Sequence, residues 1–496
     1  MAVRERLRQL SRPIAVYLTA LIGLCLLAGR ERLLEPSHDN HYSHLAQAWL
    51  DGRLDHGGKP PGWCTPERAR AKKCRQHTYD DWARVWTIEL RDGSSFRGFP
   101  CKTSACEQLR RRGVEGWLVA GTEHELREVP RRDIVRRTDT WYVSFPPGPA
   151  VAMLPAVAIW GTDAPDVLIT CLFAALIPVV MLLWFDRERG VPNHDPSRAR
   201  ERWRGRGREH LWAVAAWTFA SPAAFVGAHG RVWFTAQIFG ALCLTAYLAT
   251  SWKAQRPVLA GLALGLAVAC RPHLAVAGLF FALEWRRETQ GRERWIAAAR
   301  FAGPLLVIGL ALMALNFARF DDPFEFGHRY LDIRWQKRMQ EVGMFSTEYL
   351  ARNLRCAFSL APVWRDNGPW NGHLPKVSLH GSSILIGAPW VLALLWARER
   401  FPQRWGLLLT AAAVAVPSLL YQNSGQIQFS YRFAIDWLPM ILAAIVFGGG
   451  AKSRAFAVLV GLGAAWELYG AWLFGRRPGQ LFVTDPLGWP FEAELD

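Results

Sequence analysis

The feature that most constrains this chain is a series of long apolar windows that exclude Asp, Glu, Lys and Arg. A helix that crosses the hydrocarbon core of a bilayer needs about 20 mostly apolar residues, with roughly 17 to 25 as the range. Several windows meet this requirement, and two of them contain a single acid, Asp436 or Glu467. The windows are Pro13 to Gly29, Val167 to Phe185, Leu211 to Ala228, Val232 to Trp252, Phe301 to Ala318, Val377 to Ala397, Trp405 to Tyr431, Phe433 to Gly450 and Ala455 to Phe474. The pattern predicts an all-α polytopic membrane bundle.

The basic residues predict the orientation of that bundle. The chain has 59 Lys and Arg against 42 Asp and Glu, a net charge of +17. Lys and Arg gather in short loops on the cytoplasmic side of membrane proteins. They cluster here before the first window, at 187–208, 253–256, 286–300 and 398–404, and at Lys452 and Arg454. No helix-turn-helix or zinc-finger signature accompanies this charge, so we expect no nucleic-acid partner.

The stretch Pro257 to Leu283 has basic residues at both ends, so both ends are predicted to be cytoplasmic. It is then a pair of short helices with the Arg271–Pro272 break at its outer tip, which brings the count to about 11 crossings with the N-terminus inside. Pro146 to Gly161 is apolar but short and rich in proline, and we predict an interfacial or re-entrant helix. The first window resembles a signal peptide without an A-x-A cleavage site, and we treat it as an uncleaved span.

This topology divides the chain into eight segments. They are a cytoplasmic tail with the first span (1–29), an outer juxtamembrane region (30–82), a small β-rich insert (83–140), the interfacial segment (141–163), a transmembrane core (164–318), a second outer loop (319–381), C-terminal transmembrane helices (382–474) and an outer tail (475–496). The expected location is a bacterial inner membrane with the large loops in the periplasm.

The first outer region carries the signals of a small β domain. Residues 85–99 alternate apolar and polar side chains about an Asp92–Gly93 turn, which indicates a β-hairpin. Residues 115–137 read as further short strands. Cys64, Cys74, Cys101 and Cys106 lie in this region and suggest two disulfides, plausibly one within each local pair, with zinc binding as the alternative. Cys356 is left over as a buried thiol.

A candidate carboxylate lies just after the first span. Apolar residues from Tyr42 to Leu50 recur at helical spacing, which predicts an amphipathic helix on the membrane surface. Asp39 precedes it, flanked by His38 and His41. Asp39 is a candidate general base, and the alternative is that Ser37 or Asp39 caps the helix.

Three arginines lie at predicted outer helix ends, against the cytoplasmic bias of basic residues. Arg231, Arg271 and Arg432 could together bind phosphate through their planar guanidinium groups, or each could simply reach lipid headgroups. Asp436 lies four residues after Arg432, and an ion pair within one helix is the expected arrangement. Glu467 has no evident partner and is predicted to face the bundle interior. Weaker ligand candidates are Tyr142, His229, Gln426 and Tyr431.

Several motifs resemble the GT-C superfamily of integral-membrane glycosyltransferases, including protein mannosyltransferases, the aminoarabinose transferase of lipid A and uncharacterised bacterial members. They are H-Y-x-x-L-A-x-A-x-L-x-G-R-L (41–54), W-Y-V-S-F-P-P-G-P-A (141–150), GLALGLAVACRPHL (261–274), F-D-D-P-F-E-F-G-H-R-Y (320–330) and Q-F-S-Y-R-F (428–433). The resemblance covers most of the membrane part and not the β insert.

The resemblance implies transfer of a hexose or pentose, with inversion, from a polyprenyl-phosphate donor to a lipid, glycan or protein acceptor on the outer face. Asp39 matches the acid that activates the acceptor or holds a metal. Asn40 beside it favours direct use as a base, and a divalent metal stays open as a cofactor. Asp321 and Asp322 match a second acidic pair, or form a turn before Pro323. The alternatives are a transporter or flippase of a lipid-linked glycan precursor, and a sensor whose β insert is the working part.

Overall fold

The computed structural model describes residues 2–62, 81–122, 125–188, 206–333, 335–364 and 374–483. The chain is mostly helical and divides into two compact units. The first unit comprises Met1–Ser37, Pro165–Leu306 and Thr347–Asp496, and the second comprises His38–Ala164 and Val307–Ser346. Cys64 and Cys74 of the predicted disulfide set lie outside the described residues.

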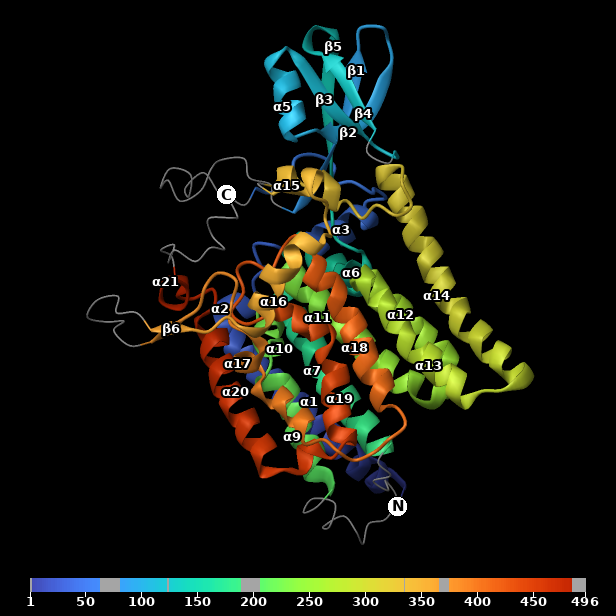
Figure 1. Cartoon of the computed structure of the whole chain (residues 1–496), viewed down its shortest axis with the longest axis vertical. Helices are drawn as coiled ribbons and strands as arrows, with labels where there is room; N and C mark the ends of the chain where they lie inside the picture. Colours follow the sequence, from blue (N-terminus) through green and yellow to red (C-terminus); the bar gives the residue numbers. More distant parts are fainter. Residues whose placement is uncertain are drawn as a thin grey trace. The chain divides into compact units, whose positions relative to one another are not determined.

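The first unit is a bundle of apolar helices with short 3₁₀ segments between them (Figure 1). Its helices are α1 (Ala2–Ala28), α2 (Arg30–Leu33), α7 (Asp166–Glu188), α9 (Arg206–Phe219), α10 (Ala223–Gly227), α11 (Val232–Ser251), α12 (Pro257–Cys270), α13 (Gly278–Glu288), α14 (Gly291–Phe320), α16 (Leu350–Phe358), α17 (Ile384–Gly387), α18 (Arg404–Leu420), α19 (Leu438–Phe447), α20 (Arg454–Leu473) and α21 (Pro478–Leu481). The 3₁₀ segments are η4 (Trp252–Ala254), η5 (Pro272–Ala277), η7 (Thr347–Tyr349), η8 (Pro389–Leu395), η9 (Arg432–Asp436) and η10 (Gly450–Lys452), and β6 (Val363–Trp364) pairs with β7 (Pro375–Lys376). Helix α14 runs from the first unit into the second.

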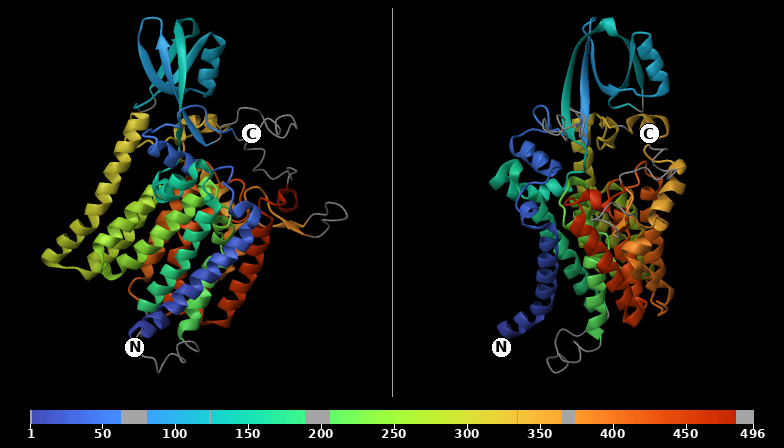
Figure 2. Two further views of the ribbon diagram at one scale, coloured as in Figure 1. Left: turned by 180° about the vertical axis from the view of Figure 1, so that it is seen from behind. Right: turned by 90° about the vertical axis from the view of Figure 1, so that its left-hand side faces the viewer.

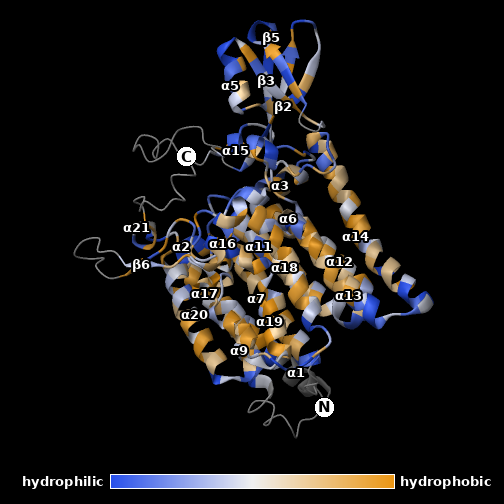
Figure 3. Cartoon of the chain, viewed as in Figure 1, coloured by the Kyte–Doolittle hydropathy of each residue, from blue (hydrophilic) through white to orange (hydrophobic). Residues whose placement is uncertain are grey.

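Five helices of the described residues are long and apolar enough to cross a membrane, as expected of a membrane protein. They are α1, α7, α11, α14 and α20, and the hydropathy colouring follows their apolar surfaces (Figure 3). The predicted count of about 11 crossings is not confirmed. Several predicted spans are shorter or broken, because Ser221 and Pro222 separate α9 from α10 and the window Val377 to Ala397 forms only α17 and η8. Proline lacks the N–H that an uninterrupted helix needs.

The predicted break at Arg271–Pro272 is present, since α12 ends at Cys270 and η5 begins at Pro272. The backbone N–H of Lys253, just before α12, donates to Glu284 Oε2 of α13 at 2.8 Å. The start of α12 and the end of α13 therefore lie together, as the prediction of two cytoplasmic ends requires.

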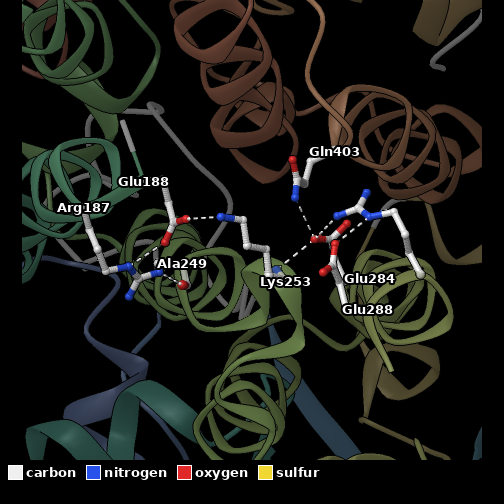
Figure 4. A network of polar contacts seen from close by, with 8 residues as sticks. Arg187, Glu188, Ala249, Lys253, Glu284, Glu288 and Gln403 are labelled. Carbon is white, nitrogen blue, oxygen red and sulfur yellow. Dashed lines mark hydrogen bonds and ion pairs between the residues drawn. The ribbon is translucent and has the colours of Figure 1, made fainter. Parts of the chain in front are cut away.

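Polar contacts gather several of the predicted cytoplasmic segments (Figure 4). Lys253 Nζ lies 3.6 Å from Glu188 at the end of α7, and Gln403 donates to the same Glu284 carboxylate at 3.3 Å. Arg187 donates to the carbonyl of Ala249 at 2.5 Å. These contacts join the ends of α7, α11 and α13 to the start of α18 on one side of the bundle.

A second group of contacts extends that side to the beginning of the chain. Arg12 Nη1 of α1 donates to Asp186 of α7 at 2.9 Å, and His210 Nδ1 of α9 lies 2.6 Å from the other oxygen of the same carboxylate. Lys452 pairs with Glu399 at 2.5 Å. Basic segments that are far apart in sequence therefore share one face, as alternating crossings of the chain predict.

The second unit contains the predicted small antiparallel sheet, seen from two further sides in Figure 2. Its strands follow the order β4-β3-β2-β1-β5. Its elements are α3 (His41–Leu50), β1 (Trp82–Leu90), β2 (Ser95–Pro100), α5 (Ser104–Arg111), β3 (Val114–Val119), β4 (Leu126–Pro130), η1 (Arg131–Asp133), β5 (Ile134–Val143), α6 (Gly148–Trp160), η2 (Gly161–Asp163), η6 (His328–Tyr330) and α15 (Gln336–Glu341). The β1–β2 hairpin turns at Asp92–Gly93, and Gly93 adopts a φ of +84° that glycine accommodates without strain.

A disulfide links the end of β2 to α5. Cys101 after β2 is bonded to Cys106 in α5, which confirms one of the two predicted local pairs. Thr103 caps α5 by accepting a hydrogen bond from the Cys106 N–H. The disulfide and the N-cap hydrogen bond together hold α5 beside β3.

Helix α6 forms over the segment predicted to be interfacial. Its 13 residues rise about 20 Å, which is short for a bilayer crossing. It packs against α3, and Asn40 Nδ2 donates to the carbonyl of Thr162 in η2 at 2.8 Å. The side chains of Val151, Ile159 and Trp160 are more than half exposed, so α6 presents an apolar face to its surroundings.

Candidate functional site

Asp39 lies in the turn that precedes α3 and is almost buried, at 9% exposure. His38 Nδ1 is 3.4 Å from Asp39 Oδ1, so the imidazole is one neighbour of this carboxylate. Asn40 occupies the N-cap of α3, and Ser37 instead donates to Asp166 Oδ2 at 2.5 Å. Ser37 therefore does not cap this helix, and the N-cap position belongs to Asn40.

The rings of His41 and Tyr42 lie in the packed core of the second unit. His41 stacks on Trp82 with 4.6 Å between ring centroids, and Tyr42 contacts the edge of Phe145 at 6.3 Å. Tyr142 is also buried and packs against a neighbouring phenylalanine of α14. His41, Tyr42 and Tyr142, all candidate substrate-binding residues from the sequence, therefore lie in the packed interior of the second unit.

Asp321 and Asp322 do not act as a pair in the structure. Asp322 Oδ1 accepts the Phe324 N–H at 2.8 Å, the turn geometry expected before Pro323. Asp321 adopts a φ of +60° and pairs with Arg97 of β2 at 2.7 Å. Asp322 also lines a small pocket with Thr122, Glu325, Arg329 and Tyr330, where burial raises the pKa of Glu325.

In the first unit, two helix breaks bring Arg271 and Asp436 together. Arg271 at the end of α12 donates to Asp436 Oδ2 from Nε at 3.1 Å and from Nη2 at 2.8 Å. His273 Nε2 lies 3.0 Å from the same oxygen. The expected pair of Arg432 with Asp436 is wrong, because this segment is a 3₁₀ helix in which residues three apart, not four, share a face.

Arg432 turns toward α11 instead. Its Nη1 donates to Gln237 Oε1 at 3.2 Å, and Gln237 Nε2 donates back to the Arg432 carbonyl at 3.1 Å. The guanidinium carbon of Arg432 lies 4.9 Å from the Phe433 ring centroid, and that of Arg271 lies 5.8 Å from it. Two guanidinium groups therefore flank one ring.

We call Gln237, Arg271, His273, Arg432 and Asp436 the broken-helix cluster. Two guanidinium groups, one imidazole and one carboxylate therefore lie within this cluster. Arg432 is 6% exposed and Asp436 is 1% exposed, so water screens their charges poorly. Guanidinium groups can hold an anion such as a phosphate through paired hydrogen bonds.

His273, Gln237 and Gln428 were not recognised as site residues from the sequence. Gln428 Oε1 accepts the Arg432 N–H at 3.0 Å, and its Nε2 donates to the carbonyls of His380 and Ser424. Gln426 was predicted instead. His273 could have been predicted as a site residue, because it lies two residues after Arg271 within the same helix break.

Arg231 belongs to a second basic group near the end of α20. Its guanidinium carbon lies 5.6 Å from the Phe474 ring centroid, and Arg32 Nη1 donates to the Phe474 carbonyl at 3.0 Å. Burial, with Arg476 and Arg231 nearby, lowers the pKa of Arg32 to about 10. Arg32 and Arg476 were missed because they are more than 400 residues apart in the chain.

His229 is buried between two carbonyl oxygens, and its ring links α10 to the end of α20. Nδ1 lies 2.5 Å from the Phe225 carbonyl and Nε2 lies 2.8 Å from that of Phe474. Burial, together with Arg32, lowers the pKa of His229 to about 3. The ring is therefore neutral at pH 7 and donates to one of the two carbonyls.

Two further buried groups complete the inventory of the first unit. Tyr431 is buried and packs edge-on to Phe433 at 6.0 Å. Glu467 of α20 is fully buried, as predicted, with Oε1 close to Gly387 and Ser430. Neither carboxylate oxygen of Glu467 makes a hydrogen bond of normal geometry with the described residues. Cys356 is buried, as expected.

Within the described ranges, no three His, Cys, Asp or Glu side chains come together as metal ligands would. No protein-family model, curated protein or solved structure matches this chain.

Proposed function

We propose that this protein is an inner-membrane glycosyltransferase of the GT-C type, which moves a sugar from a polyprenyl-phosphate donor to an acceptor on the periplasmic face. The observation that carries the proposal is the broken-helix cluster. Two helix breaks in a membrane bundle bring Arg271 and Arg432 to the two sides of the Phe433 ring, with Arg271 held by Asp436.

The chemistry of such a transfer needs a base and a stabiliser of the leaving group. Asp39 accepts the proton of the acceptor hydroxyl as its oxygen bonds to the anomeric carbon, with inversion. The bond from that carbon to the phosphate oxygen breaks, and the electron pair leaves with the polyprenyl phosphate. Arg432 stabilises the charge of that phosphate, and an almost buried guanidinium does so more strongly than an exposed one. His38 orients the Asp39 carboxylate.

The experiment uses the purified full chain in detergent with radiolabelled polyprenyl-phosphate hexose and pentose donors, and a membrane extract as the acceptor. Release of polyprenyl phosphate is measured by mass spectrometry. Asp39→Asn should abolish release. Asp51→Asn, at the exposed end of the same helix, is the matched control and should retain it. Full transfer by the Asp39→Asn protein would refute the proposed base.

Donor binding is tested separately with undecaprenyl phosphate as the probe. Arg432→Gln should weaken binding at least tenfold, because it removes one of the two cations that flank Phe433. Arg271→Gln is less informative, since it also breaks the ion pair with Asp436. Arg454→Gln, exposed at the start of α20, is the control. Equal binding of undecaprenyl phosphate by the Arg432→Gln, Arg271→Gln and Arg454→Gln proteins would refute the proposed phosphate site.

One observation favours the alternative, a transporter or flippase of a lipid-linked glycan precursor. A buried carboxylate within a membrane helix is a frequent proton carrier in transporters, and Glu467 is such a group. In proteoliposomes, proton-driven movement of a lipid-linked glycan that Glu467→Gln abolishes and Asp39→Asn leaves unchanged would favour transport over transfer.

A further inference from the structure

One corner of the β sheet of the second unit carries a concentration of arginines. It comprises the end of α5, η1 and the start of β5, and its side chains are Arg111, Arg112, Arg131, Arg132, Arg136 and Arg137, all of them exposed. We call these six residues the arginine corner. They occupy two stretches about 20 residues apart in the chain, so the fold brings them together.

Backbone contacts join the segments of the corner directly. The Arg131 N–H donates to the carbonyl of Gly113, next to Arg112, at 2.9 Å. Glu115 of β3 accepts from Arg131 Nε at 3.2 Å and from Arg137 Nη2 at 3.0 Å, so one carboxylate holds two of the arginines. The backbones of the two stretches are therefore joined, and the side chains of Arg131 and Arg137 are held in place.

The positive charge of the corner exceeds the negative charge around it. Glu115 serves two arginines, and Asp133 lies 3.9 Å from Arg132, whose side chain is 85% exposed. Glu89 lies opposite Arg136 in the β1–β5 register. Six guanidinium groups therefore face three carboxylates.

The guanidinium groups of three arginines in the corner are not paired with another side chain of the described residues. The side chains of Arg111, Arg112 and Arg136 make no hydrogen bond or ion pair with the residues that the structure describes. Guanidinium groups hold carboxylates and phosphates through two parallel hydrogen bonds, and exposed ones are open to an outside anion.

The position of the corner argues against the lipid headgroups next to α6. Strand β5 begins at the corner with Ile134 and ends at Val143, five residues before α6. Ten strand residues span roughly 30 Å, several times the distance over which physiological salt screens charge. The corner lies at the opposite end of β5 from the exposed apolar face of α6.

We propose that the arginine corner binds an anionic polysaccharide that carries carboxylates at regular intervals. An extended chain of this kind can contact several of these exposed arginines at once, and each contact adds to the affinity. Val135, 66% exposed, is the large apolar side chain that the corner presents, whereas peptide partners usually anchor through several buried apolar or aromatic residues. This inference does not depend on the proposed transferase activity.

The experiment measures binding of fluorescein-labelled oligogalacturonate of ten sugars to the purified full chain at 50 and 300 mM salt. The quadruple variant Arg111→Gln/Arg112→Gln/Arg132→Gln/Arg136→Gln should bind at least tenfold more weakly, and the wild type should lose affinity at the higher salt. Arg131 and Arg137 are kept because they bind Glu115.

The matched control is Arg292→Gln/Arg300→Gln/Arg398→Gln/Arg454→Gln, which removes the same charge from exposed positions of the first unit. It should bind as the wild type does. Equal weakening in both variants, or no binding by the wild type, would overturn the proposal. Tighter binding of polyglutamate of equal charge, or of phosphatidylglycerol vesicles, would also overturn it and would identify an acidic peptide or a membrane as the partner.

Discussion

Replacement of Asp436 by Asn should destabilise the first unit strongly. Asp436 accepts three hydrogen bonds from Arg271 and His273 in a place where its side chain is 1% exposed and that of Arg271 is 15% exposed. Asn keeps the shape and removes the charge, which leaves the guanidinium without a counter-ion. Breaking a buried pair by removing one partner costs about 3 to 5 kcal/mol.

The assay is equilibrium unfolding of the full chain in mixed micelles with increasing SDS, followed by the fluorescence of its tryptophans. The double variant Arg271→Gln/Asp436→Asn should be more stable than the sum of the two single variants predicts, by about 2 kcal/mol, because it leaves no charge unpaired. Glu399→Gln is the control. It breaks a pair whose side chains are about half exposed and should cost no more than about 1 kcal/mol.

The cluster would have to be reinterpreted if Asp436→Asn were as stable as Glu399→Gln. The same would follow if the losses in unfolding free energy of the two single variants simply added up in the double variant. Arg271 would then have another counter-charge or good access to water. Either result would also weaken the inference that this part of the bundle is suited to a phosphate.

Three further perturbations test separate parts of the fold. Gly230→Ala should lower the yield of folded protein and its melting temperature by several degrees, because Gly230 has a φ of +55° and a new Cβ would lie 2.4 Å from the Cα of Val167. Removal of the Cys101–Cys106 disulfide by Cys101→Ser should cost the sheet about 2 kcal/mol from the entropy of its short loop, measured as faster hydrogen exchange of β2 and β3. His44 should make the second unit acid-sensitive: burial lowers its pKa to about 4 from 6.5, so the stabilising neutral form is fully present above pH 6.5 and is lost as the pH falls toward 4. Proteolysis of the sheet between pH 7 and 4.5 should therefore accelerate, and less so in His44→Gln.

Each of these three predictions has a control of the same chemical type. Gly461→Ala adds a methyl group in α20 that meets no atom within 4 Å and should be tolerated. Cys243→Ser removes a cysteine without a disulfide. His38→Gln replaces a histidine that is 40% exposed, and its acid sensitivity should match the wild type. A control that behaved like its test variant would contradict the corresponding prediction.

Local patterns were the part of the fold that could be predicted. The alternation about Asp92–Gly93 predicted the β1–β2 hairpin, and the apolar spacing after Asp39 predicted α3. Arg271–Pro272 predicted the break between α12 and α13. Each of these signals depends on neighbours within a few residues, where chain geometry and side-chain periodicity act directly.

The sequence by itself predicted a membrane protein, because long uncharged windows alternate with basic loops, and five helices of the described residues are long and apolar enough to cross a membrane. Partners within the site were decided only by the tertiary structure. Asp436 was expected to pair with Arg432 and instead pairs with Arg271, 165 residues away, because the shape of η9 turns its side chain toward η5. The grouping of Arg32 with Arg231 and Arg476, and that of the arginine corner, could not be predicted from the sequence either. The physical reason is that charge and hydrogen-bond energies depend on distance in space, which the order of residues along a chain does not specify.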